Sequence, residues 1–289
     1  MMNKYTAESG KTDTAKQLLV RNDSSLSITF IGVGSAFTKK FYQNNALVVK
    51  NNDHALVDCG TRTPEALAAM GLSVTDVHNY LITHSHADHI GGLEEVMLLN
   101  RYVARQKPTM IAPAAYRKFL WKHSLKGGAS YNERIDGKFL RFGDLWNVVD
   151  TVPVAGADRE LCEARVGSIK FAMFRTKHIP DSAPSWRSSS PSYGVMIDDR
   201  ILFTSDTRFD PELIEFLADR YRIDAIFHDC QLYSGGVHAS LDELADLPAA
   251  VRAKTRLMHF GDAVENHVEK AAALGFMGFV RQGEPYIFP

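Results

Sequence analysis

Short apolar runs alternate with amphipathic stretches along most of the chain. Runs rich in β-branched and aliphatic residues predict strands at 26–31, 46–49, 55–57, 80–83, 169–174, 193–197, 201–204 and 225–227. Apolar positions three and four residues apart predict helices at 63–70, 90–100, 211–220, 241–245 and 263–274. Because strands and helices alternate in two successive blocks, the pattern predicts an α/β protein with two packed sheets and helices on the outer faces.

Two segments depart from this pattern. Residues 114–158 show no sustained period and contain the turn signals Lys126-Gly127-Gly128 and Ile135-Asp136-Gly137, so we expect a loop-rich insertion there. Residues 1–25 are mostly polar, and we expect them to form a flexible or extended segment in front of one domain at 26–289.

The composition narrows the class of protein. The 289 residues include 33 Lys and Arg against 34 Asp and Glu, a formal net charge of −1, so no overall positive field attracts nucleic acid. Cys59, Cys162 and Cys230 are widely spaced and odd in number, which argues against a disulfide framework. No stretch approaches the roughly 18 apolar residues of a membrane span, and the N-terminus lacks the apolar core of a secretory signal. We therefore expect a cytoplasmic protein.

The densest group of candidate ligands lies in the stretch THSHADHIGG, residues 83–92. The apolar run before it predicts a buried strand, so its polar residues leave the carboxyl end of that strand, where the sites of α/β sheets collect. His84 and His86 can hold one ion, and Asp88 and His89 on the following turn can face a second ion. Zn²⁺ favours such ligands, and Mn²⁺ or Fe²⁺ accepts them. A solvated, histidine-rich loop is the alternative, but the position at a strand end favours a metal site.

The same stretch resembles the HxHxDH signature of the metallo-β-lactamase superfamily, including the two glycines that follow it. The resemblance implies an αββα sandwich of two packed mixed sheets with helices on the outer faces. It also implies ligands further along the chain, each after a predicted strand, and an aspartate, Asp58, that supports the histidine loop. The implied ligands are His84, His86 and His178 for one ion, Asp88, His89 and His259 for the other, and Asp206 between them.

Two shorter stretches resemble the ribonuclease Z branch of this superfamily: FHDCQ at 227–231 and VHAS at 237–240. The resemblance implies that His238, oriented by Asp229, protonates the leaving oxygen of a phosphodiester, because an alkoxide leaves poorly. With Asp88, these two residues are the candidate catalytic residues. It also implies substrate contacts at Ser192 and Tyr193, whose hydroxyl and backbone donors could bind phosphate oxygens. The alternatives are a packing histidine at 238 and an ordinary strand start at 192–193.

The C-terminal part of the chain is similar to the anti-Pycsar proteins, phage and bacterial phosphodiesterases that cleave 3′,5′-cyclic mononucleotides used as immune signals. The stretches that carry this likeness are residues 228–252 and 257–262. The resemblance implies two divalent ions (Zn²⁺, or else Mn²⁺), a small cyclic nucleotide such as cCMP, cUMP, cAMP or cGMP as substrate, and a homodimer. Tyr116, Trp121 and Tyr131 would then be candidates for stacking a base, with a small satellite core as their alternative.

Two other hydrolytic functions stay open at this point. A ribonuclease Z-type tRNA nuclease is disfavoured because residues 114–158 are too short and too ordinary in charge to match the long basic arm that grips tRNA. A thioesterase or lactonase of the same superfamily would have no use for a proton donor at His238. A metal-dependent sensor without enzymatic activity is disfavoured because every implied ligand position is filled.

Overall fold

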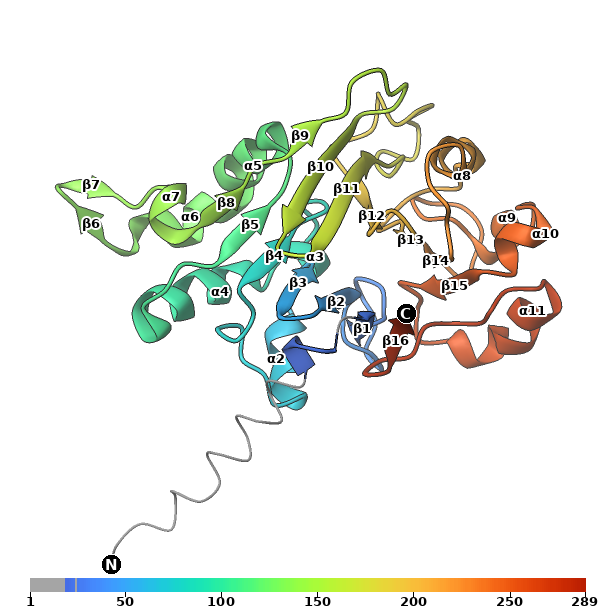
Figure 1. Ribbon diagram of the computed structural model, residues 1–289, viewed down its shortest axis with the longest axis horizontal. Helices are drawn as coiled ribbons and strands as arrows, with labels where there is room; N and C mark the ends of the chain where they lie inside the picture. Colours follow the sequence, from blue (N-terminus) through green and yellow to red (C-terminus); the bar gives the residue numbers. More distant parts are fainter. Residues whose placement is uncertain (1–18, 24) are drawn as a thin grey trace, which may run out of the picture.

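Two mixed sheets packed against each other make up the centre of the molecule (Figure 1). Across residues 19–23 and 25–289, which the computed structural model describes, the first sheet has seven strands. In spatial order they are β16 (Pro285–Phe288), β1 (Leu26–Gly32), β2 (Asn45–Lys50), β3 (Asp53–Val57), β4 (Asn79–Leu81), β5 (Thr109–Ile111) and β8 (Asn147–Val149). This sheet comes almost entirely from the first half of the chain.

The second sheet comes from the second half of the chain and also has seven strands within the described residues. Their spatial order is β15 (Thr255–Met258), β14 (Ala225–Asp229), β13 (Ile201–Phe203), β12 (Tyr193–Ile197), β11 (Ile169–Arg175), β10 (Leu161–Val166) and β9 (Val152–Pro153). Every residue of β12 and β13 is buried, as expected for central strands covered on both faces.

Each sheet is antiparallel on one side and parallel on the other. In the first sheet β3, β4, β5 and β8 are parallel neighbours, and in the second sheet β13, β14 and β15 are. The carboxyl ends of parallel strands lie at one edge, and the connecting loops there are free to carry chemistry. The predicted site loops after β3, β4, β13, β14 and β15 all leave strands of these parallel groups. The loop after β11 is the exception.

Helices cover the outer faces of the two sheets (Figure 1). Leu213 of α8, Leu241 of α9 and Ala271 of α11 share a buried cluster with Met196 and Leu202 of the second sheet. The α-helices of the described residues are α2 (Thr63–Ala69), α3 (Ala87–Ile90), α4 (Leu93–Leu99), α5 (Ala114–Leu120), α6 (Lys126–Ala129), α7 (Phe142–Leu145), α8 (Pro211–Ala218), α9 (Leu241–Leu244), α10 (Ala249–Arg252) and α11 (Val268–Ala273). None of the helices in this part of the chain is long and apolar enough to cross a membrane.

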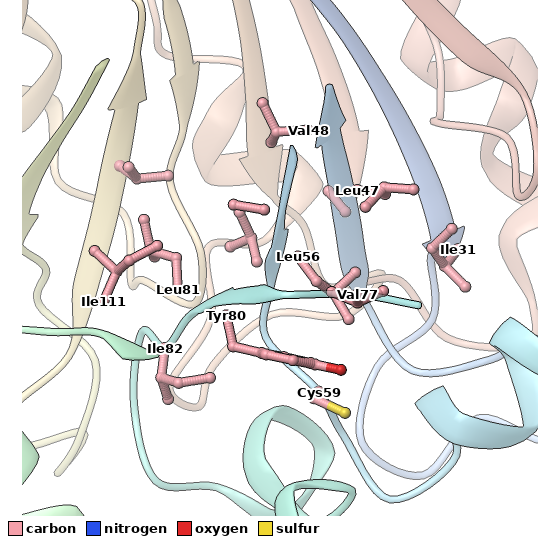
Figure 2. Close-up of a cluster of buried hydrophobic side chains, with 14 of the residues drawn as sticks. Ile31, Leu47, Val48, Leu56, Cys59, Val77, Tyr80, Leu81, Ile82 and Ile111 are labelled. Carbon is pink, nitrogen blue, oxygen red and sulfur yellow. The ribbon is translucent and has the colours of Figure 1, made fainter. Parts of the chain in front are cut away.

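Apolar side chains fill the space between the sheets. Figure 2 shows part of this cluster, in which Leu47 of β2 and Leu56 of β3 are fully enclosed. Phe30 of β1 joins the two sheets, because its ring centroid lies 6.1 Å from that of Phe203 and 5.0 Å from that of Phe227. Removal of this apolar surface from water is the main favourable contribution to folding. It also fixes how the loop-bearing edges of the two sheets face each other.

The structure confirms the predicted α/β architecture, and most predicted elements lie within a few residues of the observed ones. The predicted helix at 90–100 is an exception, because α3 and α4 flank Gly91 and Gly92. A Cβ on Gly92 would lie 2.7 Å from the carbonyl oxygen of Gly60. The glycine therefore lets the histidine loop pack closely on the chain that leaves β3.

Residues 114–158 differ from the expected loop-rich insertion. They begin with α5, a π-helical stretch (Trp121–Leu125) and α6, and they end by adding β8 to the first sheet and β9 to the second. The sequence misleads here because Gly127 and Gly128 lie within α6 and do not form a turn. The second turn signal is correct, since Asp136 and Gly137, both at positive φ, join β6 (Arg134–Ile135) to β7 (Lys138–Phe139).

Most of the expected N-terminal segment, residues 1–18 and 24, lies outside the described residues. The described part of it is packed on the domain. Val20 is buried, the backbone N–H of Asn22 donates to the carbonyl of Asn51 at 2.8 Å, and its side chain donates to the carbonyl of Val49 at 3.2 Å. Residues 19–23 are therefore held against β2 and the turn that follows it.

Candidate metal centre

Three loops, those after β4, β11 and β13, bring three imidazoles together with a carboxylate. His84 Nε2 lies 3.0 Å from His86 Nδ1, which lies 3.2 Å from His178 Nε2. Asp206, which follows β13, places Oδ2 3.6 Å from His84 Nε2 and 3.8 Å from His178 Nε2. One potential ligand atom from each residue lies within 4.8 Å of the others. The structure thus brings together the residues predicted for the first ion.

A second cluster lies beside the first and shares Asp206 with it. His89 Nε2 is 3.3 Å from both Asp88 Oδ2 and Asp206 Oδ2. His259 Nε2, from the loop after β15, is 3.2 Å from Asp88 Oδ2 and 3.6 Å from Asp206 Oδ2. These are the residues predicted for the second ion, and all four are buried. Asp206 is the point at which the two clusters meet.

The spacing and the partners of these atoms fit divalent ions. Ligand atoms about 2.0–2.1 Å from a tetrahedral ion lie roughly 3.3 Å apart, close to the separations in both clusters. Among the described residues, both carboxylate oxygens of Asp206 and Nε2 of His89 are buried without a hydrogen-bond partner. A buried carboxylate without donors is unfavourable unless a cation neutralises it. Both clusters can therefore bind a divalent cation, and the donors do not distinguish Zn²⁺ from Mn²⁺.

The ligand rings are held from behind by hydrogen bonds. Asp58, after β3, accepts through Oδ2 from Nδ1 of His89 at 2.7 Å and from the Thr83 hydroxyl at 2.7 Å. Nδ1 of His178 donates to the carbonyl of Val237 at 2.9 Å. Such contacts fix the ring orientation and leave the other nitrogen free for a metal. The place of Asp58 was predicted, whereas Thr83 and Val237 carry no signal in the sequence.

The protonation of the imidazoles differs between the two clusters. Burial lowers the pKa of His84 well below 6.5 and that of His178 to about 4, so both rings are neutral, as metal ligands must be. Burial also acts on His89 and His259, but the carboxylate of Asp206 and its acidic neighbours outweigh it and raise the pKa of both rings. A cation in the second cluster would therefore displace protons from these two rings.

The backbone is strained where the site residues leave their strands. Asp58 has φ 64°, Ser205 φ 52° and His259 φ 61°, in the left-handed region that non-glycine residues rarely adopt. Each of the three begins a site loop or neighbours a candidate ligand. Strain of this kind persists only where the surrounding structure enforces it, and it concentrates at functional sites.

The predicted acid–base pair adjoins the second cluster. Nδ1 of His238 lies 2.8 Å from Asp229 Oδ2 and 3.8 Å from Asp206 Oδ2. Burial lowers the pKa of His238, but the Asp229 carboxylate more than compensates and the pKa is raised overall. The sequence did not indicate that the other oxygen of Asp229 lies 3.2 Å from Nδ1 of His259. Asp229 therefore supports a candidate ligand as well as the candidate acid.

The candidate substrate residues Ser192 and Tyr193 do not face an open surface. Both are buried, and the Ser192 hydroxyl accepts from the Thr176 hydroxyl at 2.7 Å. The Tyr193 hydroxyl donates to Glu160 at 2.8 Å, and its backbone N–H donates to the carbonyl of Thr83 at 3.2 Å. Ser192 joins neighbouring segments of the second sheet and Tyr193 joins the two sheets, so the geometry does not support direct substrate contact.

Tyr116 also differs from its suggested role of stacking a base. Its side chain is 1% exposed, and its hydroxyl lies 3.0 Å from Oγ of Ser85, between the first two candidate ligands. Trp121 packs against Phe142, and Tyr131 stays exposed beside Phe139. Tyr116 therefore supports the histidine loop, Trp121 packs against the main apolar cluster, and Tyr131 belongs to neither.

A family model and curated relatives match nearly the whole chain. The model described as "Anti-Pycsar protein Apyc1" matches residues 26–286. The chain belongs to this family. An anti-Pycsar protein Apyc1 of Paenibacillus harenae is 38% identical over 243 residues, covering 84% of this chain and 92% of the relative. Another, of Bacillus phage vB_BsuM-Goe3, is 38% identical over 272 residues, covering 90% and 97%.

Solved structures show the fold of this family member. The metallo-β-lactamase fold protein YhfI from Bacillus subtilis superposes with a TM-score of 0.65 at 14% identity, covering 91% of this chain and 99% of that one. The short form of human tRNase Z gives a TM-score of 0.61 at 16% identity, with the same coverage. The likeness confirms the metallo-β-lactamase fold predicted from the sequence.

Proposed function

We propose that this member of the anti-Pycsar protein Apyc1 family is a two-metal phosphodiesterase that opens 3′,5′-cyclic mononucleotides to nucleoside monophosphates. The proposal combines the family membership with the two clusters that share Asp206 and the adjoining pair of His238 and Asp229. The resemblance to the anti-Pycsar proteins supports a cyclic nucleotide as the substrate, and the two candidate metal clusters support a hydrolytic reaction. cCMP, cUMP, cAMP and cGMP are the substrates to be tested.

In the proposed reaction the water is activated by the bound ions, and His238 protonates the leaving oxygen. Bound at the two clusters, divalent ions would supply an acidified water and positive charge for the phosphoryl oxygens. The water gives up a proton to the surrounding solvent as its oxygen bonds to phosphorus, and the bond from phosphorus to one ribose oxygen breaks. The electron pair stays on that ribose oxygen, which takes a proton from His238. Asp229 holds the imidazole through Nδ1 at 2.8 Å, which leaves Nε2 to deliver the proton.

The observation that carries the proposal is the position of His238. It adjoins Asp206 and His178, with a ring centroid 5.1 Å from that of His178, yet 20% of its side chain is exposed. Most of the candidate ligands are enclosed, so His238 is one of the few site groups that can touch a substrate. A partly exposed histidine with a raised pKa beside two metal clusters is suited to protonate an alkoxide leaving group.

The test is a panel of substrates incubated with the purified protein before and after chelation. We expect cyclic mononucleotides to be converted to nucleoside monophosphates, resolved by chromatography, and we expect chelation to stop the reaction. Precursor tRNA, a thioester and a lactone serve as the competing substrates. Cleavage of one of these with no turnover of any cyclic nucleotide would overturn the proposal.

Two finer features are part of the proposal. We propose Zn²⁺ as the bound metal, with Mn²⁺ as the other candidate, because both accept imidazole and carboxylate ligands. We also propose a homodimer, on the strength of the family resemblance alone. Metal analysis of protein purified without added metal tests the first feature. Light scattering tests the second, and a monomer at all working concentrations would contradict it.

A further inference from the structure

A polar pocket opens beside His238. Its volume is about 430 Å³, which is within the usual range of small-molecule sites. The loop after β11, the loop after β13 and the loop after β14 form its walls. It is lined by Lys177, Asp181, Arg208, Phe209, Gly235, Gly236, His238 and Glu243.

The walls of this pocket are tied together by hydrogen bonds. The Arg208 backbone donates to the carbonyl of Lys177 at 2.6 Å, and its guanidinium donates to the carbonyl of Ala183 at 2.8 Å. The third wall is fixed because the Gln231 side chain donates to the carbonyl of Gly235. Gly235 and Gly236, both at positive φ, let this loop turn back towards His238. The pocket is therefore formed by three loops whose conformations are fixed by hydrogen bonds and which carry site residues.

The proposed chemistry determines which half of the substrate lies here. A general acid must touch the atom that it protonates. The atom that His238 protonates is a ribose oxygen, so the ribose and its base must occupy space next to His238. His238 supplies part of the lining of this pocket.

The charges of the lining residues suit an uncharged group. Lys177 and Arg208 balance Asp181 and Glu243, so apart from the proton-donating His238 the lining has no excess positive charge for a second phosphate. Glu243 is already engaged by the Ser240 hydroxyl at 2.7 Å. The ammonium of Lys177 has no hydrogen bond or ion pair with any described residue, which leaves its three donors for a ligand.

Phe209 provides an aromatic surface in the same pocket. Its ring is only partly buried. It packs against the apolar cluster under α8 and also lines the pocket, so part of the ring surface stays accessible to a ligand. Lys177 and Phe209 also line a smaller cavity of about 120 Å³ that reaches Trp186. Stacking on an aromatic ring is a common, sequence-tolerant way to bind a nucleobase.

We propose that this pocket binds the nucleoside half of the substrate, with Phe209 stacking on the base and Lys177 donating to an oxygen of the base or ribose. The proposal rests on the proposed function, because it takes His238 as the proton donor. It assigns Lys177 and Phe209 to substrate binding and not to the chemical step. Their loss should therefore weaken binding and leave the rate of the bound complex unchanged.

The experiment compares Lys177→Met and Phe209→Leu with two controls outside the pocket, Lys122→Met and Phe119→Leu. For the metal-loaded protein and the best cyclic mononucleotide, we expect each pocket variant to raise KM about tenfold, the loss of one hydrogen bond or stacking contact. We expect kcat to stay within about twofold. The controls should match the parent protein in both constants.

Direct binding separates this proposal from the proposed function. Calorimetry with the neutral nucleoside of the preferred base should give a Kd that both pocket variants weaken about tenfold, whereas inhibition by inorganic phosphate should not change. If cyclic nucleotides are hydrolysed but both variants keep the parent KM and nucleoside Kd, the pocket assignment is wrong. A variant at Lys177 that weakens phosphate inhibition as much as nucleoside binding would also overturn it. Absence of any hydrolysis of cyclic nucleotides overturns the proposed function instead.

Discussion

The two halves of the candidate metal centre are built in different ways. Four of its candidate ligands come from six consecutive residues, 84–89, on the single loop that follows β4. The other three, His178, Asp206 and His259, follow three separate strands of the second sheet, β11, β13 and β15. The first half is a local motif, whereas the second half exists only after the strands of the second sheet have been aligned.

The supports of the two halves differ in the same way. Asp58 and Thr83 of the first sheet hold the histidine loop. Asp229 of the second sheet holds His259 and His238. Asp206 is the residue that both clusters share, with Oδ2 3.3 Å from His89 Nε2 and 3.6 Å from His259 Nε2. Substitutions in the two halves should therefore fail in distinguishable ways, and a substitution at Asp206 should damage both halves.

The largest effect is expected for Asp206→Asn. The substitution removes the negative charge common to both clusters, so both metal affinities should fall by more than the roughly 10–100-fold that is typical of lost supporting contacts. Metal analysis should find fewer than two ions per chain, and hydrolysis should approach background. Asp219→Asn, on an exposed aspartate at the end of α8, is the matched control. Full metal content in the Asp206 variant would show that this residue does not join the halves.

The next effect is expected for His238→Ala, which touches the second half alone. Removal of a positioned proton donor should slow hydrolysis of a cyclic nucleotide by about 10²–10⁴-fold, with both ions retained. A nitrophenyl phosphodiester has a leaving group that departs without protonation. The His238→Ala variant should therefore lose much less of its hydrolysis rate on this substrate. His123→Ala is the control. If the variant lost equal rate on the two substrates, or lost bound metal, His238 would not be the general acid.

Asp229→Asn separates two functions of the second half. Because Asp229 contacts both His238 and His259, we expect the leaving-group dependence of the His238 variant in milder form, together with weaker binding of one ion. Kinetics with the two substrates and a metal titration of the same preparation would measure both effects. A change in the leaving-group dependence at unchanged metal affinity would show that the contact to His259 is unimportant.

A smaller effect is expected for Asp58→Asn, which tests the first half. Asp58 accepts from His89 and the Thr83 hydroxyl through one oxygen and from the Thr83 backbone N–H through the other, and an asparagine has only one acceptor oxygen. Metal affinity and activity should therefore fall by about 10–100-fold, the usual result of losing a supporting contact. The leaving-group dependence should stay as in the parent protein, because His238 is untouched. If that dependence changed, the two halves would be less separate than the geometry indicates.

The smallest effect concerns His54, at the other end of β3 from Asp58. Burial and the neighbouring His78 lower the pKa of His54 from 6.5 to about 4. The unfolded chain therefore binds this proton below about pH 6.5, while the folded protein does so only near pH 4. Stability is fully present above pH 6.5 and falls with the pH, by about 2 kcal/mol at pH 5 from this group.

His54→Gln is designed to remove that pH dependence while keeping an acceptor for the backbone N–H of His78, which donates to His54 Nε2 at 3.1 Å. Denaturant unfolding at pH 7.5 and pH 5 should show a smaller loss of stability for this variant than for the parent protein. His123→Gln should lose as much stability as the parent. Equal losses for all three proteins would contradict the lowered pKa of His54.

The first half of the metal centre can be predicted from the sequence more directly than the second half. The histidine loop can be recognised because its four ligands lie within six consecutive residues and because an apolar run places them at a strand end. His178, Asp206 and His259 are isolated polar residues after apolar strands, and only the order of a known family pattern identified them. The prediction of a loop-rich segment at residues 114–158 was wrong about the helices, since Lys126, Gly127 and Gly128 form part of α6 instead of a turn.

Tertiary contacts account for the rest of what the sequence did not show. Tyr193 begins a predicted strand and Ser192 precedes it, but their partners Thr176, Glu160 and Thr83 are remote in the sequence. β16 and β9 are edge strands of two to four residues that are defined by pairing and not by composition. Neither the contact of Asp229 with His259 nor the pocket beside His238 could be predicted from residue spacing.

The central claim is that the two halves form one centre that needs two ions for hydrolysis. The most direct measurement is a titration of metal-free protein with Zn²⁺ or Mn²⁺ while the opening of a cyclic mononucleotide is followed. The account predicts that activity rises to a plateau at two equivalents of metal per chain. Full activity without metal, or a plateau at one equivalent, would contradict it.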